Sequence, residues 1–348
     1  MIDVQERPAP GPAEAPAWRH KDLLDTDVLS RADIDLVMET ADAMLEVRSR
    51  PVAKVATLRG ATVVTLFYEQ STRTRASFEV AAKAMGADVV NLTASGSSVV
   101  KGESLVDTVR TLEAIGADLL VMRHDRSGAP YLAAKNTRAG VINGGDGTHA
   151  HPTQALLDLF TMRRHLGALD GKKVVIVGDV LHSRVARSNV WSLLAAGANV
   201  TLCGPATLLP RTLASAGGEE GRVALTADLD RALVDADVVM ALRIQKERQA
   251  TGLIPSLREY INGYQVNATR LARAKPGALV MHPGPMSPRM VESRMLNSHT
   301  YRWWLTNCGS TDGHTPWKKT CASPAPVART ASTAAMSSDS MLSANSLP

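Results

Sequence analysis

The chain has 348 residues, of which 45% are hydrophobic and 21% charged, and its formal net charge is +5. This composition is typical of a soluble folded protein with about two domains and argues against a disordered chain. No apolar run approaches the roughly 20 residues of a membrane span. The charged, proline-rich N-terminus lacks the apolar centre of an export signal.

The cysteines and the distribution of charge narrow the class of protein further. Cys203, Cys308 and Cys321 lack the paired spacing of a metal site or a disulfide framework, which favours a cytoplasmic location. Residues 287–348 contain six Lys or Arg and three acidic residues, so they carry +3 of the net charge. The nearly neutral remainder argues against nucleic acid as a partner.

Short apolar runs alternate with helical patterns along most of the chain. Residues 1–17, rich in Pro, Ala and Glu, are expected to be disordered. An amphipathic pattern then predicts a helix from about Trp18 to Val47. Further on, the sequence predicts strands at 61–68, 87–92, 117–123, 140–144, 173–179, 198–203, 236–243 and 277–283. Helices are predicted at 72–85, 103–115, 151–166, 184–196 and 256–260.

Such alternation predicts an α/β protein with parallel sheets covered by helices on both faces. The elements form two sets divided near Gly167–Gly171. We therefore expect two doubly wound domains, residues 18–166 and 167–286, with an active site in the cleft between them. Residues 287–348 lack both periodicities and contain 18 Ser or Thr, so we expect an irregular tail.

The sharpest motif is the segment Glu69–Arg75, which reads EQSTRTR between a predicted strand and a predicted helix. Free N–H groups at a helix start attract anions. Ser71, Thr72 and Thr74 add hydroxyl donors, and Arg73 adds a guanidinium that matches phosphate oxygens. A capped helix with a solvated arginine would explain Ser71 alone, but it explains the repeated hydroxyl–arginine pattern poorly. The motif therefore favours a phosphate site.

A second motif, residues 144–154, combines a glycine-rich strand end with a helix start. His151 and Gln154 lie on one face of the first turn, where His151 can donate to a carbonyl oxygen and Gln154 can hold an amide. A single histidine at this place is more often a capping or packing residue. His149 and His151 lack the further ligands that a metal site needs.

Three more arginines, Arg123, Arg184 and Arg243, follow predicted strands or open the next helix. Each alone is more often an exposed cation or an ion-pair partner. Because the carboxyl ends of parallel strands share one edge, together they indicate a site for a substrate with several negative charges.

These motifs, in this order and spacing, resemble the aspartate carbamoyltransferase family from about residue 20 to Met286. The resemblance implies transfer of the carbamoyl group from carbamoyl phosphate to L-aspartate in de novo pyrimidine biosynthesis. It also implies that residues 18–166 bind carbamoyl phosphate and residues 167–286 bind aspartate, with no cofactor and no metal.

The resemblance assigns a role to individual residues of this chain. The phosphate would be bound by Ser71, Thr72, Arg73 and Thr74. Thr74, Arg123 and His151 would polarise the carbamoyl oxygen, Gln154 would hold the amide, and the backbone around Gly284 and Pro285 would contact the same group. Arg184, Arg243, Gln245 and Lys101 would hold aspartate.

The resemblance also implies a homotrimer, because Ser97 and Lys101 would enter the active site of a neighbouring subunit. Val100 is more apolar than that loop leads us to expect. Glu69 would bridge to Arg184 and Arg248 when the domains close. A dihydroorotase or a regulatory chain would be a possible partner.

Two alternatives remain open at this stage. Ornithine carbamoyltransferases share the phosphate motif, but this chain has His282–Pro285 (HPGP) in place of their His-Cys-Leu-Pro turn, and arginines where a diamino acid would be repelled. A non-catalytic scaffold is the other alternative, because the tail does not match the family. A frameshift near Met286 would explain that mismatch.

Overall fold

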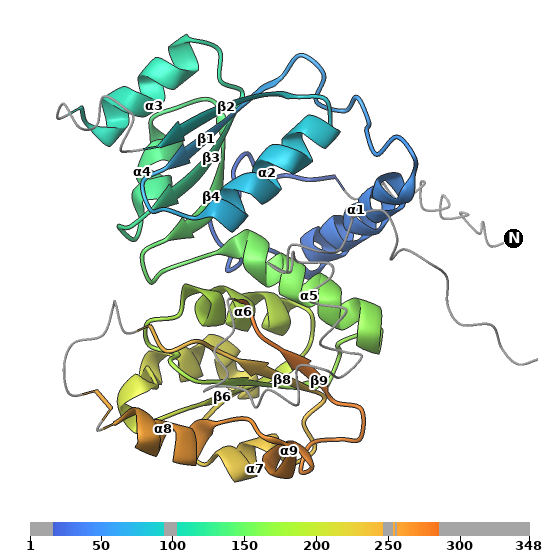
Figure 1. Cartoon of the computed structure of the whole chain (residues 1–348), viewed down its shortest axis with the longest axis vertical. Coiled ribbons are helices and arrows are strands. Elements are labelled where there is room, and N and C mark those ends of the chain that lie inside the picture. Colours follow the sequence, from blue (N-terminus) through green and yellow to red (C-terminus); the bar gives the residue numbers. More distant parts are fainter. Residues whose placement is uncertain (1–16, 94–102, 246–252, 255, 285–348) are drawn as a thin grey trace, which may run out of the picture. The chain divides into compact units, whose positions relative to one another are not determined.

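The computed structural model describes residues 17–93, 103–245, 253–254 and 256–284 (Figure 1). The expectations for residues 1–16 and for the tail, residues 287–348, lie outside the described residues. Within the described part, no helix has the length and apolar character to cross a membrane.

The first sheet contains four parallel strands in the order β2-β1-β3-β4. Their bounds are Thr62–Phe67 for β1, Asp88–Thr93 for β2, Leu119–His124 for β3 and Gly140–Asp146 for β4. Helix α2 (Thr72–Ala84) packs on one face, whereas α3 (Leu105–Ala114) and α4 (Ala129–Lys135) pack on the other (Figure 1). The strands alternate their side chains between these two apolar layers.

The second sheet contains five parallel strands in the order β7-β6-β5-β8-β9. Their bounds are Lys173–Val177 for β5, Asn199–Cys203 for β6, Val223–Thr226 for β7, Val238–Ala241 for β8 and Leu279–Met281 for β9. Helix α6 (Arg184–Ala195) covers one face. Helices α7 (Leu229–Leu233), α8 (Leu257–Tyr264) and α9 (Ala268–Leu271) lie on the other face (Figure 1). Two 3₁₀ segments, η3 (Ala206–Leu208) and η4 (Arg211–Glu220), join β6 to β7.

Each sheet reverses its strand order once. In the first sheet the chain moves from β1 outward to β2 and then returns to place β3 on the other side of β1. In the second sheet it moves from β5 through β6 to β7 and returns to place β8 beside β5. Ligands of open α/β sheets bind outside the carboxyl ends of the strands at such reversals. A ligand site is therefore expected at the segments that follow β1, β3, β5 and β8.

Two helices, α1 (Arg31–Ser49) and α5 (Pro152–Leu166), pack together with the α6 side of the second sheet. Both contribute to the largest apolar cluster, which also contains the α6 face of the second sheet. Ile34 and Met38 of α1, together with Leu159 and Met162 of α5, are almost completely buried there. The division expected near residue 167 separates the sheets, but α5 packs with the core of the second sheet.

The α/β prediction and all eight predicted strands are confirmed, with bounds that differ by a few residues. The predicted helix from Trp18 to Val47 is wrong in its first part, because α1 begins at Arg31 with Ser30 as its cap. The preceding segment lies along β4 instead, where Leu23 pairs with Ile142 and the backbone N–H of Asn143 donates to Leu23. The pattern also missed β7, α4, α7 and α9, all of which have four to seven residues.

Candidate active site

The phosphate motif forms the turn from β1 into α2. Ser71 is the helix cap: its hydroxyl accepts a hydrogen bond from the N–H of Thr74 at 3.4 Å and donates to the Thr74 hydroxyl at 2.9 Å. The first turn of α2 has no acidic residue, so no carboxylate neutralises the positive end of the helix dipole. Thr72 and Arg73 are exposed beside these groups. This turn therefore has the chemistry of an anion site.

Arg123 lies in β3, next to β1 at the strand-order reversal. Its side chain is 10% exposed. One terminal nitrogen donates to the carbonyl of Gly144 at 3.1 Å, and the other donates to Glu69 at 2.6 Å. The neighbouring strand and the β1–α2 turn thus hold this guanidinium at the edge of the sheet.

Arg184 brings a second guanidinium to the same carboxylate. It is the first residue of α6 and its side chain is 7% exposed. Its two terminal nitrogens donate to the two oxygens of Glu69, each at 2.9 Å, and Nη1 also donates to the carbonyl of Gly147 at 3.1 Å. Although burial alone raises the pKa of Glu69, Arg184 and Arg123 lower it to about 2. Glu69 is therefore a carboxylate held between two cations, one from β3 and one from α6.

Gly145 makes this close approach possible. It has a φ of +116°, which L side chains rarely adopt, and a Cβ atom there would lie 3.0 Å from the Arg184 guanidinium carbon and 3.1 Å from Nη1 of Arg123. Glycine at position 145 therefore leaves the space that the guanidinium groups of Arg184 and Arg123 occupy.

His151 occupies the N-cap position of α5, where its side chain makes no capping hydrogen bond, and it is 8% exposed. Its backbone N–H donates to the hydroxyl of Ser188 on α6 at 2.9 Å. Burial, and then the charges of Arg184 and Arg123, hold the pKa of His151 well below 6.5. The imidazole is consequently neutral near pH 7 and can donate one hydrogen bond to a carbonyl oxygen without carrying a charge.

Gln154 lies in the first turn of α5 and is partly exposed. Its side-chain nitrogen donates to Asp158, one turn further along the helix, at 2.9 Å. Asp158 is 1% exposed and also accepts a hydrogen bond from Asn189 of α6 at 2.9 Å. Asp158 and Asn189 were not predicted from the sequence, although residues four positions apart, such as Gln154 and Asp158, are neighbours on one face of a helix.

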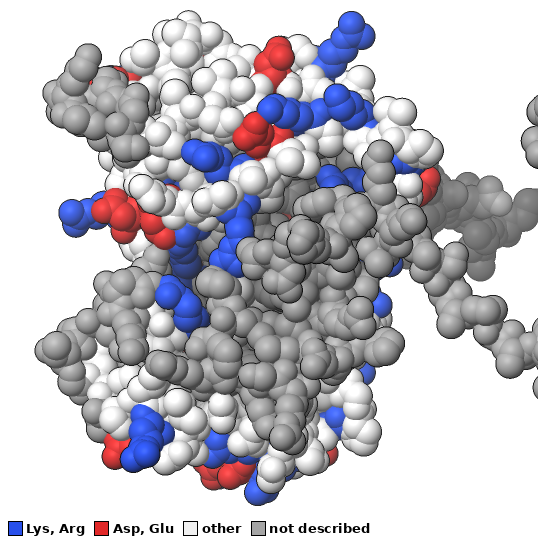
Figure 2. All heavy atoms as spheres, in the orientation of Figure 1, with Lys and Arg blue, Asp and Glu red and all other residues white. Residues whose placement is uncertain are grey.

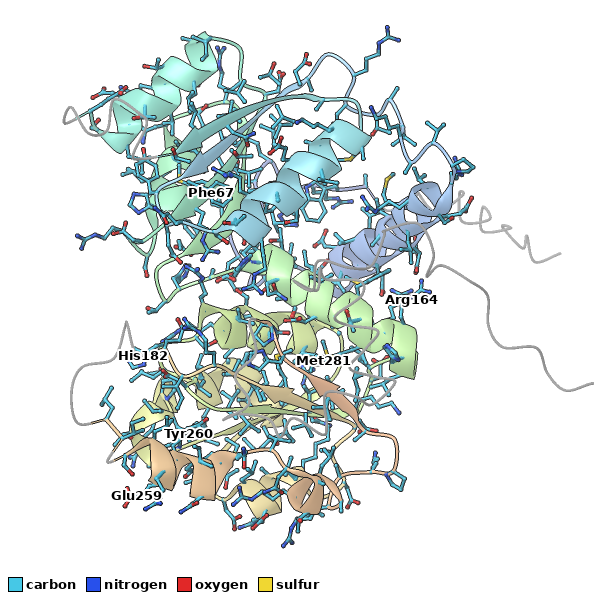
Figure 3. The ribbon with its side chains drawn as sticks, in the orientation of Figure 1. Phe67, Arg164, His182, Glu259, Tyr260 and Met281 are labelled. Atoms are coloured by element: carbon cyan, nitrogen blue, oxygen red, sulfur yellow. The ribbon has the colours of Figure 1, made fainter. Side chains whose placement is uncertain are left out.

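The carboxyl edge of the second sheet carries the other predicted residues. Arg243 and Gln245 follow β8 and are partly exposed. The backbone N–H of Gln245 donates to the buried Asp179 at 3.3 Å, and Asp179 also accepts from the ring of His182 at 2.8 Å. His182, labelled in Figure 3, lies in the loop between β5 and α6. Asp179 therefore connects the segment after β5 with the segment after β8, and these are the neighbouring strands at which the strand order reverses.

His282 follows β9 and is fully buried. It accepts a hydrogen bond at Nδ1 from the N–H of Gly284 at 2.9 Å, which orients the turn that contains Gly284. Burial, followed by the charges of Arg243 and Arg73, lowers the pKa of His282 to about 4. Arg73 lies in α2 and Arg243 follows β8, so the charge of an arginine from each domain acts on this ring.

Most of the predicted site residues that the structure describes thus belong to segments that meet at the two strand-order reversals. Figure 2 shows Lys and Arg side chains gathered near the start of α2. Four predicted residues, Ser97, Lys101, Arg248 and Pro285, lie outside the described residues. Of the two bridges predicted for Glu69, the one to Arg184 is present, and Arg123 provides a further one.

Comparison with known proteins identifies the family. Residues 21–164 match the carbamoyl-phosphate-binding domain of aspartate/ornithine carbamoyltransferases, and residues 170–299 match their Asp/Orn-binding domain. The chain is 55% identical over 275 residues to an aspartate carbamoyltransferase catalytic subunit from Dehalococcoides mccartyi, covering 79% of this chain and 83% of the relative. It is 58% identical over 279 residues to the subunit from Roseiflexus sp., covering 79% and 87% of the two chains.

Solved structures agree with this result. Aspartate transcarbamoylase from Trypanosoma cruzi, in complex with N-(phosphonacetyl)-L-aspartic acid, superposes with a TM-score of 0.72 at 31% identity, covering 80% of this chain and 88% of that one. Ornithine carbamoyltransferase from Thermus thermophilus shares the fold, with a TM-score of 0.71 at 24% identity over 82% and 93% of the two chains. The chain therefore belongs to the aspartate/ornithine carbamoyltransferase family.

Proposed function

We propose that this chain is an aspartate carbamoyltransferase, which transfers the carbamoyl group of carbamoyl phosphate to the amino group of L-aspartate in pyrimidine biosynthesis. The observation that carries the proposal is the pair of buried guanidinium groups, Arg123 and Arg184, held at one carboxylate beside the anion-binding start of α2. Relatives with 55% and 58% identity that bear this name support the choice of aspartate.

In this proposal the carbamoyl donor lies at the first sheet. The phosphate accepts hydrogen bonds from the N–H and hydroxyl groups of Ser71, Thr72 and Thr74 and pairs with Arg73. Arg123, Thr74 and neutral His151 donate to the carbamoyl oxygen, and Gln154 and the backbone around Gly284 and Pro285 bind the rest of the group. Residues 18–166 would form the domain that binds carbamoyl phosphate.

Aspartate would be held by the second domain, residues 167–286. Arg184, Arg243 and Gln245 would bind its two carboxylates, with Ser97 and Lys101 supplied by a neighbouring subunit of a trimer. Arg184 already binds one carboxylate, that of Glu69, with two parallel hydrogen bonds. An aspartate carboxylate needs the same geometry from a guanidinium.

The reaction follows from these positions. The uncharged α-amino group attacks the carbamoyl carbon, a C–N bond forms, and negative charge develops on the carbamoyl oxygen. Fixed donors from Arg123, Thr74 and His151 stabilise that oxyanion, which is commonly a large part of catalysis. The C–O bond to phosphate then breaks, and the leaving phosphate takes up the amine proton. Holding both substrates in line removes much of the entropic barrier.

The first test is the formation of carbamoylaspartate by the purified chain, with L-ornithine as the competing acceptor. We expect activity with aspartate and none detectable with ornithine, because arginines repel a diamino acid. Arg243→Ala should raise the KM for aspartate far more than that for carbamoyl phosphate, with a loss of about 2–4 kcal/mol in transition-state binding. Preferential use of ornithine would refute the substrate assignment, and inactivity with both would favour a non-catalytic scaffold.

The trimer has a separate test. Lys101→Ala and Arg73→Ala chains, each inactive alone, are mixed under conditions that exchange subunits. Some interfaces of the hybrid trimers would combine two unaltered halves, so part of the activity should return. Absence of recovery, despite exchange verified by mass spectrometry, would mean that each site is built within one chain.

We further propose that the enzyme works in the cytoplasm, because its three cysteines, without paired spacing, suit a reducing compartment. Fractionation of cells that produce the tagged chain would test this.

A further inference from the structure

The hydrogen-bond partner of Gln154 determines which atom of its side-chain amide can face the substrate. Gln154 has both a donor and an acceptor on its side-chain amide, and which of the two faces the substrate depends on its neighbours. Here Nε2 donates to Oδ1 of Asp158 at 2.9 Å. Because Asp158 holds Nε2, the amide oxygen Oε1 lies on the side turned away from that carboxylate, where it can accept a hydrogen bond from a ligand.

Asp158 is built into the interior between α5 and α6. It is 1% exposed, and its second oxygen, Oδ2, accepts from Nδ2 of Asn189 at 2.9 Å. The orientation of the Asn189 amide is fixed independently, because the same Nδ2 donates to the backbone carbonyl of Val185 at 3.0 Å, and a carbonyl can only accept. Asn189 thus presents a donor to Asp158, and ionised Asp158 accepts on both oxygens.

We infer that Asp158 fixes the orientation of the Gln154 amide so that Gln154 offers an acceptor to the amino group of the carbamoyl donor. Asp158 is then a positioning residue that selects a donor with an amino group over one with a methyl group in its place. This inference rests on the proposed function, because it takes the ligand of Gln154 to be the carbamoyl group.

An isosteric substitution separates this role from packing. In Asp158→Asn, the oxygen of the new amide must face the donor on Asn189, so its nitrogen faces Gln154. Two nitrogens cannot form the bond, and Gln154 must rotate to bring its oxygen towards the new amide. The interior keeps its volume and its number of hydrogen bonds, but the substrate now meets the nitrogen of Gln154.

Acetyl phosphate is the matched probe, since a methyl group replaces the amino group of carbamoyl phosphate while the phosphate and carbonyl remain. Burial raises the pKa of Asp158 to about 7, and hydrogen bonds from Asn189 and Gln154 oppose that shift, so assays are run at pH 8 where the carboxylate dominates. The KM for carbamoyl phosphate and the inhibition constant of acetyl phosphate are measured for each chain.

In Asp158→Asn we expect the KM for carbamoyl phosphate to rise about 10- to 100-fold. The amino group of the substrate would lose its hydrogen bond to the oxygen of Gln154 and would face the nitrogen of Gln154, which is also a donor. The inhibition constant of acetyl phosphate should change less than about 3-fold, since a methyl group makes no such bond. If both constants rise by the same factor, Asp158 only supports the structure and the inference is wrong. It is also wrong if neither constant changes.

A double variant, in which the carboxylate and the amide change places between positions 154 and 158, tests the same inference. In Gln154→Glu/Asp158→Asn, the new carboxylate on the first turn of α5 accepts from the new amide and again offers an oxygen to the amino group. The net charge is unchanged, and the effect of moving the carboxylate towards the substrate acts on both phosphates and cancels in the ratio of the two constants. Recovery of the wild-type ratio supports the inference even if Asp158→Asn alone folds poorly, and a ratio that stays at the single-variant value refutes it.

A control variant and the wild-type chain separate the possible failures. Asp170→Asn alters an exposed carboxylate that is paired with Arg31, and it should leave both constants unchanged. If the wild-type chain neither binds nor uses carbamoyl phosphate, the proposed function fails, and the inference fails with it. If the wild type is active but Asp158→Asn keeps its preference for carbamoyl phosphate, only the inference fails.

Discussion

Replacing Glu69 with glutamine removes the one negative charge shared by two buried cations. The glutamine has nearly the same shape, so the packing of the β1–α2 turn should survive. Its nitrogen, however, would face the terminal nitrogens of Arg184 or Arg123, which in the wild type donate to carboxylate oxygens at 2.6–2.9 Å. The variant therefore leaves buried guanidinium charge without its carboxylate, which is the costly way to break an ion pair.

The pKa of Glu69 gives the size of the effect. A fall from the ordinary value of 4.5 to about 2 in the folded protein corresponds to about 3 kcal/mol, at 1.36 kcal/mol per pKa unit. The side chain is 25% exposed, so water screens part of this interaction. We expect Glu69→Gln to lower the free energy of unfolding by about 2 kcal/mol near pH 7.

The pH dependence has a defined sign. Because the folded pKa of Glu69 lies below its ordinary value, its stabilisation is fully present above about pH 4.5 and is lost as the pH falls towards about 2. The difference between wild type and Glu69→Gln should thus be constant from pH 8 to about pH 5 and shrink on further acidification. Urea unfolding at a series of pH values, followed by circular dichroism, measures this difference.

Glu46→Gln is the control for charge alone. Glu46 pairs with Arg50 at 2.9 Å on an exposed helix face, where an ion pair contributes little. A Glu69→Gln effect no larger than that of the control would refute the reasoning. So would a difference that grows as the pH falls below 4.5.

Three further changes test other parts of the structure. Gly145→Ala should lower kcat/KM about 10-fold or more, because its Cβ would displace the guanidinium groups of Arg184 and Arg123; steady-state kinetics check this. Asp146→Asn should cost about 2–4 kcal/mol of stability in denaturant unfolding, since the buried carboxylate accepts hydrogen bonds from two backbone N–H groups and two side chains. Replacing residues 287–348 with the ending of a relative should raise the thermal midpoint, because this tail lacks apolar periodicity; an unchanged midpoint would show that the native tail packs well.

Much of the fold was readable from the sequence because local patterns and tertiary structure agree. The apolar runs that became β1, β3, β5 and β8 are buried on both faces, so they appear as continuous hydrophobic segments. A capping residue also marked a helix start: Ser71 accepts a hydrogen bond from the first turn of α2. The start of α1 was misjudged because residues before Ser30 have an amphipathic pattern but gain more by pairing with β4.

The residues of the candidate site were predicted from the sequence, but among the contacts between described residues only the bridge from Glu69 to Arg184 was predicted, and it came from the family resemblance. The motifs identified which side chains can bind phosphate, carbonyl and carboxylate groups, because those capacities belong to the residue types. Only the folded chain brings Glu69 to Arg123, 54 positions away, and to Arg184, 115 positions away. Likewise, the pairing of Asp158 with Asn189 depends on how α5 packs against α6. Sequence determined the chemistry of each side chain, whereas the order of strands and the packing of helices decided which of them meet, since such long-range contacts have no local pattern.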